Sequence, residues 1–182
     1  MKYLFLAIVR RALCLAVLCG MLCSGCGRSE SAKGSTGVSL YIKSGVTVPD
    51  DCRQWLVSFL DAFNGKDGAR MLELTGPKDV IEHMAQAPEA ARKSMVDSAI
   101  KNVQRISLQL GDLKSCSVEY CKESTFTTDA QPPGPMGAGR YVKIQCQAKG
   151  SKRDAKASFT LYKKADGSDP IIGLWNFTWS PF

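Results

Sequence analysis

The spacing of apolar residues changes near Val103 of this 182-residue chain, and that change limits the folds that the chain can adopt. Before Val103, apolar residues recur every three or four positions, as on a helix that buries one face. After it they mostly alternate with polar residues, as on a half-buried strand. Helices followed by a run of strands predict an α+β fold, with N-terminal helices packed on a curved antiparallel sheet of about four to six strands.

The clearest predicted helix begins at Pro49-Asp50-Asp51, where an aspartate can cap free amide groups, and it stops near Asn64-Gly65. Its apolar face consists of Cys52, Trp55, Leu56, Phe59, Leu60 and Phe63. Three further helical segments are expected over residues 67–74, 79–86 and 88–102. Pro88 lacks an amide hydrogen and therefore predicts a break or kink before the last of them.

Six segments have the alternation or composition of strands: 38–42, 106–110, 122–128, 142–148, 155–161 and 171–179. Gly150-Ser151 suits a hairpin turn between the fourth and the fifth. Residues 131–139 are rich in proline and glycine and are expected to form a mobile loop. The last strand places three aromatic residues on one face: Trp175, Phe177 and Trp179. They are a candidate pocket for an apolar ligand, with a packed sheet core as the alternative.

The first 25 residues have the three-part order of an export leader. Lys2, Arg10 and Arg11 form a basic start, and an apolar run of eleven residues follows over 12–22. This run is shorter than the roughly 20 residues that cross a bilayer as a helix. We therefore expect residues 1–25 to be a signal peptide that is removed, with a transmembrane anchor as an alternative.

The end of the leader, Leu22-Cys23-Ser24-Gly25-Cys26, resembles the lipobox of bacterial lipoproteins. In a lipobox, small residues such as Ser24 and Gly25 precede the cysteine that receives the lipid. Cys23 departs from the pattern, because leucine is usual at that position. The resemblance implies that Cys26 is lipidated and becomes the first residue of the mature protein. An ordinary secretory leader that is cut nearby is the alternative.

Residues 26–37 are small and polar after the cysteine, which predicts a flexible tether between the lipid and a single domain over 38–182. Gly27 is not the aspartate that marks inner-membrane retention in many enteric bacteria, so the periplasmic face of the outer membrane is the expected location. Without the three basic leader residues, the formal charge falls from +7 to +4. These positive residues are spread out, which argues against a nucleic-acid partner. The expected partners are the membrane, through Cys26, and an envelope protein.

The predicted mature chain has four cysteines besides Cys26, namely Cys52, Cys116, Cys121 and Cys146. An even number in an exported chain favours two disulfides, and four cysteines allow three connectivities. Cys52 and Cys146 fall on predicted buried faces, so we pair them as a hypothesis, which leaves Cys116 with Cys121. A Cys121–Cys146 bridge across adjacent strands stays open. With His83 as the only histidine, and expected at the surface, no metal or cofactor is predicted.

The helix from Trp55 to Phe63, the Gly65-Lys66-Asp67 turn and the closing strand Gly173-Leu174-Trp175-Asn176-Phe177 carry a resemblance to a known family. In these features the domain resembles the nuclear transport factor 2-like superfamily, also called the cone or cystatin-like α+β fold, and its small lipoproteins of unknown function. Enzymes of that superfamily place an aspartate or histidine in the mouth of the cone. No inward Asp, Glu or His can be assigned to the clear predicted strands, and Asn176 falls on the opposite face. No catalytic residue is predicted.

These observations favour a membrane-anchored envelope lipoprotein whose domain is a non-enzymatic binding or interaction module. Two alternatives stay open. A small-molecule-binding or enzymatic cone would enclose a cavity of several hundred Å³ that holds an ionisable side chain. An immunity-type inhibitor would cover the active site of a toxin. A cone that is filled by tryptophan and phenylalanine would support the first interpretation.

Overall fold

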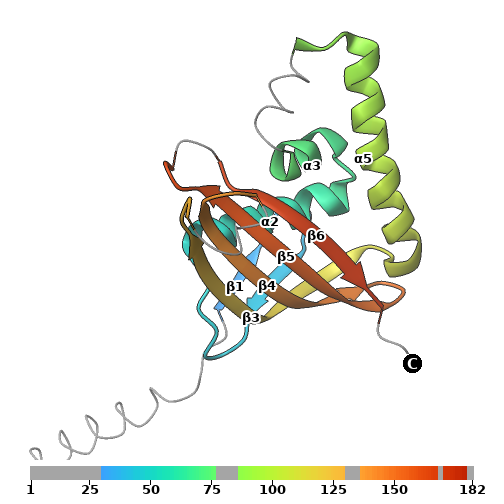
Figure 1. Ribbon diagram of the computed structural model, residues 1–182. Coiled ribbons are helices and arrows are strands. Elements are labelled where there is room, and N and C mark those ends of the chain that lie inside the picture. The colour runs from blue at the N-terminus through green and yellow to red at the C-terminus, as the bar shows by residue number, and fades with distance from the viewer. Residues whose placement is uncertain (1–29, 77–85, 130–135, 168–169, 180–182) are drawn as a thin grey trace, which may run out of the picture.

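The computed structural model describes residues 30–76, 86–129, 136–167 and 170–179, which form the predicted α+β fold. A curved, open sheet of six strands in the order β1 to β6 packs against three helices (Figure 1). The elements are β1 (Glu30–Lys33), β2 (Ser39–Ile42), α2 (Asp50–Gly65), α3 (Gly68–Thr75), α5 (Glu89–Leu110), β3 (Leu113–Phe126), β4 (Gly139–Gly150), β5 (Asp154–Lys164) and β6 (Ile172–Thr178).

The sheet is mixed and not antiparallel throughout, which corrects the sequence prediction. β2 runs parallel to β3, with Leu40 opposite Cys116, whereas every other neighbouring pair is antiparallel. Parallel neighbours need a long crossover connection, usually a helical one. All three described helices lie between β2 and β3 in the chain and supply that crossover.

α2 confirms the clearest helix prediction and buries the expected face against the sheet. Its first turn carries Asp50 and Asp51, which favour the positive end of the helix dipole. The helix ends at Lys66, whose backbone is left-handed with φ 55°. Asn64 then ties it to the start of β3, because its side chain donates to the Leu113 carbonyl at 3.2 Å and accepts from the Leu113 amide at 2.8 Å.

α3 and α5 follow the sequence prediction at their starts but not at the end of α5. The Asp67 side chain accepts a hydrogen bond from the Arg70 amide at 3.0 Å and caps α3. α5 begins directly after Pro88 and continues to Leu110, so the strand predicted over 106–110 is wrong. Leu108 is 72% exposed while Leu110 is fully buried, so the two do not share one buried face as strand alternation requires. The helix predicted over 79–86 lies almost wholly outside the described residues.

The N-terminal part of the domain begins earlier than expected, because residues 30–37 of the predicted tether are structured. β1 pairs with β2, and the turn between them is held by Asp61 of α2. The Asp61 carboxylate accepts hydrogen bonds from the amides and hydroxyls of Ser35 and Thr36, at 2.7 to 3.0 Å. Short polar residues can therefore form a strand here, since β2 supplies the backbone partners and α2 supplies the anchor.

The later strands agree with the alternation in the sequence. The segments 142–148 and 155–161 lie within β4 and β5, and β6 falls inside the predicted 171–179. The segment 122–128 is not a separate strand, because β3 is continuous to Phe126. Of the predicted loop 131–139, Met136 and Gly137 contact the Tyr141 hydroxyl, each at 2.7 Å, and Gly139 already belongs to β4. Residues 131–135 lie outside the described residues.

Candidate functional site

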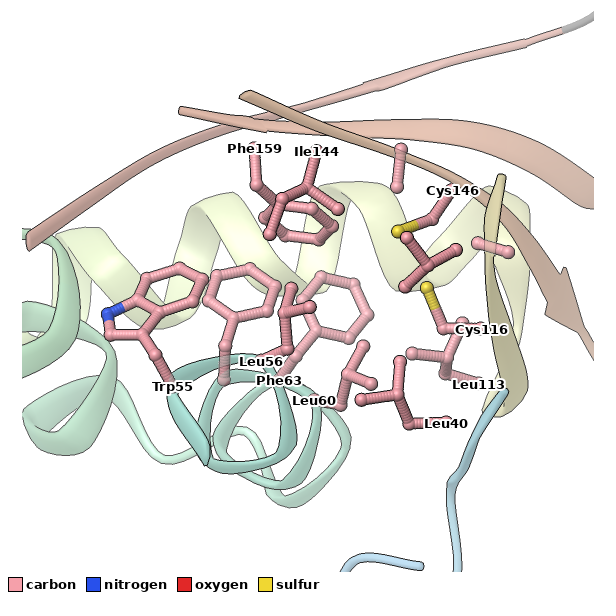
Figure 2. Close-up of a cluster of buried hydrophobic side chains, with 14 of the residues drawn as sticks. Leu40, Trp55, Leu56, Leu60, Phe63, Leu113, Cys116, Ile144, Cys146 and Phe159 are labelled. Carbon is pink, nitrogen blue, oxygen red and sulfur yellow. The ribbon is translucent and has the colours of Figure 1, made fainter. Parts of the chain in front are cut away.

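Aromatic rings fill the space between α2 and the sheet. Phe59 is fully buried at the centre, and its ring centroid lies 5.2 Å from Trp55, 5.2 Å from Phe159 and 5.4 Å from Trp175. Figure 2 shows Trp55, Phe63 and Phe159 converging on this region together with Ile144 and Leu56. Carbon atoms therefore fill the space between α2 and this part of the sheet.

The three aromatic residues of the predicted apolar pocket have different surroundings. Phe177 is buried and stacks on Phe63, with 5.3 Å between ring centroids. Trp179 is partly buried and lies under the Arg153 guanidinium, 5.4 Å from its ring centroid. Trp175 packs on Phe59 and also reaches a surface groove. Of these three residues, Trp175 lines a hollow in the described part of the chain that a ligand or partner could enter from outside.

That hollow, the α3–α5 groove, has a volume of about 420 Å³. It is lined by Met71, Leu72 and Thr75 of α3, by Ser94, Met95, Ser98, Ala99 and Asn102 of α5, and by Trp175 of β6. Methionine, leucine and tryptophan form an apolar floor, and the hydroxyls and the amide lie among them. A lining of this kind suits an apolar side chain that enters the groove, because the hydroxyls and the amide can hydrogen-bond with polar groups beside that side chain.

The groove exists because α3 and α5 cross closely at one end. A Cβ atom added to Gly68 would lie 2.7 Å from the Val96 carbonyl oxygen and 2.6 Å from Ile100 Cγ1. The Trp55 indole nitrogen donates to the Leu74 carbonyl at 3.1 Å and fixes α3 against α2. The sequence did not indicate this groove, because no periodic pattern reports how closely two helices cross.

A second polar group, the rim cluster, consists of Asp51, Glu123 and Arg140. Arg140 donates to Asp51 at 2.7 Å and to Glu123 at 2.9 Å. Glu123 lies opposite Val142 and on the helix-facing side of the sheet, where the sequence predicted no acidic residue. The pairing of β3 with β4 shifts between Val118 and Tyr120, so alternation counted from the buried Val118 assigns Glu123 to the wrong face.

The electrostatics of the rim cluster favour ion pairing over proton transfer. Burial alone would raise the pKa of Asp51, but the hydrogen bond and the charge of Arg140 outweigh it and hold that pKa below its ordinary value of 3.8. Asp51 is therefore a weak base. Burial, aided by the charge of Asp51, raises the pKa of the neighbouring Cys52 thiol to about 12. Cys52 would remain a neutral thiol at pH 7 and would be a poor nucleophile.

The four cysteines of the domain are free thiols in the structure, so the predicted disulfide connectivity stays a prediction. Cys146 lies beside Cys116 of the adjacent strand, and the two sulfur atoms point toward each other in Figure 2. Cys52 lies at the rim beside Arg140, with 3.9 Å between its sulfur and Nη2.

Two predicted positions, Cys26 and His83, lie outside the described residues. Within the described ranges, no three His, Cys, Asp or Glu side chains gather closely enough to hold a metal ion. In that same part of the chain, no helix combines the length and the apolar character needed to cross a bilayer. Comparison of the chain with protein-family models, with curated proteins and with solved structures gave no match.

Proposed function

We propose that this protein is a membrane-anchored envelope lipoprotein whose domain binds a protein partner without catalysing a reaction. The anchoring rests on the lipobox-like segment that ends at Cys26. The binding role rests on α5, because only Val103 and Leu110 among its 22 residues are buried. A helix with this much accessible surface, next to an apolar groove, can receive a partner without rearrangement of the core.

The chemistry of the α3–α5 groove defines the class of partner. Met71 and Met95 have flexible, polarisable side chains that adapt to the shape of an apolar group. Trp175 offers a large aromatic surface of the kind that dominates binding energy at interfaces. The proposed occupant is an apolar side chain on a segment of another envelope protein, whose backbone would reach Ser94 and Ser98.

The enzymatic cone receives less support. The aromatic rings around Phe59 occupy the space beneath the sheet, and the carboxylates of Asp51 and Glu123 are both paired with Arg140. The high pKa of Cys52 argues against a thiolate nucleophile. The immunity-type alternative remains an untested prediction, because no feature of the groove or of the rim cluster points to a toxin.

Metabolic labelling tests the membrane anchor. Cells that express the full chain are fed radiolabelled palmitate, and the Cys26→Ala variant is compared with Cys23→Ala. Label should enter the wild type and the Cys23→Ala variant and be lost from Cys26→Ala. Equal labelling of Cys26→Ala and the wild type would overturn the anchor, as would the absence of label from all three.

Photo-crosslinking in intact cells tests the groove. A photoreactive phenylalanine replaces Ser98 in the groove or, as a control, Gln104, which is exposed on α5 outside the groove. A protein adduct should form from position 98 and not from position 104, and an added Ser94→Arg change should abolish it. Equal adducts from both positions, or an adduct that survives Ser94→Arg, would exclude the groove as the binding surface.

A further inference from the structure

Cys116 of β3 and Cys146 of β4 are neighbours on the helix-facing side of the sheet. Cys116 is paired with Ala148 and Cys146 with Val118, so the two cysteines occupy adjacent positions on one face. Both are buried, with 0% and 3% of their surface exposed. In Figure 2 their sulfur atoms face each other in the core, near Leu113. Because the two thiols face each other from neighbouring strands, they are placed to form a bond of about 2.05 Å.

The other two cysteines lie at the rim cluster. Cys52 of α2 is 3.9 Å from Arg140 Nη2, measured to its sulfur. Cys121 precedes Glu123 by two residues on the same face of β3, and Glu123 accepts from Arg140 Nε at 2.9 Å. Arg140 therefore links the first turn of α2, through Asp51, to Glu123 on the face of β3 that also carries Cys121. The charges of Asp51, Arg140 and Cys121 each influence the pKa of Cys52.

We propose that the mature protein contains a Cys116–Cys146 disulfide between β3 and β4 and a Cys52–Cys121 disulfide between α2 and β3. This connectivity is the one that neither sequence-based hypothesis contained. It rests on the proposed export, because disulfides persist in oxidising compartments. Each bond forms when two thiols lose two protons and two electrons to the disulfide of an envelope thiol oxidoreductase, which is reduced to a dithiol.

The two bridges would have different accessibility. Cys116 and Cys146 are buried in the core, so a reductant would reach a bond between them only when the domain opens. Cys121 is partly exposed at the rim, so a bond to Cys52 would be open to reductant in the folded protein. We expect mild reduction to break the Cys52–Cys121 bond first and to leave Cys116–Cys146 intact.

Peptide mapping of the full chain tests the connectivity. The protein is purified from membranes in detergent without reductant, after alkylation of its free thiols. Trypsin alone leaves Cys116 and Cys121 in one peptide, 115–122, because no Lys or Arg separates them. A glutamate-specific protease then cuts after Glu119. The four cysteines fall in peptides 44–53, 115–119, 120–122 and 144–149.

The expected products are peptide 115–119 linked to 144–149 and peptide 44–53 linked to 120–122. Any other linkage would overturn the proposal, and so would alkylated Cys116 and Cys146 in the exported protein. The variant Cys146→Ala should release 115–119 in alkylated form. If that variant does not fold, the Cys121→Ala variant still tests the core bridge, because it should retain the link between 115–119 and 144–149 and lose the other.

A reoxidation experiment separates the connectivity from the location. The purified full chain is reduced and then oxidised with glutathione disulfide, which supplies the oxidant without any export step. The same two linkages should form. If they form while palmitate labelling fails, the proposed location is wrong and the connectivity stands. If labelling succeeds and another connectivity forms, the disulfide proposal is wrong and the location is unaffected.

Discussion

Asp61 determines how the first eight described residues attach to the domain. Its carboxylate receives four hydrogen bonds from Ser35 and Thr36, and a Cβ atom on Gly34 would collide with its oxygen. Sequence reasoning assigned these small residues to a tether because they have no apolar side chain to bury. That argument overlooks backbone amides, which a single carboxylate from a distant helix can satisfy.

Replacement of Asp61 by alanine should destabilise the N-terminal hairpin. We expect Asp61→Ala to lower the free energy of unfolding at pH 7 by about 1–2 kcal/mol, because it leaves the turn amides without their acceptor. Urea denaturation of the full chain in detergent measures this change. Asp97→Ala, at an exposed position on α5, is the control and should change stability by less than about 0.5 kcal/mol. Equal effects of the two variants would contradict the role of Asp61.

Acidification should reduce the difference in the free energy of unfolding between Asp61→Ala and the wild type. Burial acts to raise the pKa of Asp61, but the hydrogen bonds from Thr36 and Ser35 outweigh it and hold that pKa below 3.8. The stabilisation is therefore complete above the unfolded-state pKa and is lost as the pH falls through the lower folded-state value. Urea titrations should show a constant difference between about pH 7 and 5 that narrows below pH 3.8. A difference that persists to low pH would indicate another cause.

Arg140 controls the charge state of the rim. In the Arg140→Gln variant, burial would act on Asp51 without the opposing guanidinium, so the pKa of Asp51 should rise. Carboxyl chemical shifts from NMR, followed from neutral to acidic pH, measure this pKa. The control is Arg70→Gln, which removes an exposed i, i+3 ion pair with Glu73 and should leave the pKa of Asp51 unchanged. An unchanged pKa in Arg140→Gln would contradict the ion pair.

At the scale of elements, helices and strands with long periodic patterns were predictable and their ends were not. α2 was found because its apolar face repeats over several turns. The end of α5 was missed because Ile106, Leu108 and Leu110 alternate over only five residues, which a helix ending also permits. The rim cluster depends on the register shift in β3, and the α3–α5 groove on a helix crossing. Neither feature has a local signal in the sequence.

The crossing of α3 and α5 offers a test at the same scale. Gly68→Ala should destabilise the protein by about 1–3 kcal/mol, because the new methyl group would overlap the backbone of α5, and overpacking has costs of this order. The gain in helix propensity, about 1 kcal/mol, offsets only part of that. Urea denaturation compares it with Gly65→Ala, whose added Cβ would lie 4.0 Å from the closest side-chain atom, Thr36 Cγ2. If Gly68→Ala is as stable as Gly65→Ala, the result would contradict the close crossing of α3 and α5 at Gly68.

At the scale of the whole molecule, the proposed lipid on Cys26 and the start of β1 together would limit the distance from membrane to domain. If the lipid is on Cys26, four residue steps separate it from Glu30, where β1 begins. At about 3.5 Å per residue, they reach at most about 14 Å. Neutron reflectometry of the lipidated protein on a supported bilayer should show a gap no larger than this. Insertion of a glycine-serine segment after Gly27 should widen it, and an unchanged gap would contradict direct tethering.

With a connection this short, the proposed lipid anchor would hold the domain at a nearly fixed height above the membrane. The α3–α5 groove would sample only a thin layer above the lipid headgroups, and its effective concentration toward partners in that layer would be high. A segment deeper in the periplasm would not encounter it, however well it matched Met71, Met95 and Trp175. The distance of a partner segment from the membrane would then contribute to selectivity, together with its chemistry. A longer connection between Cys26 and β1 would relax that restriction.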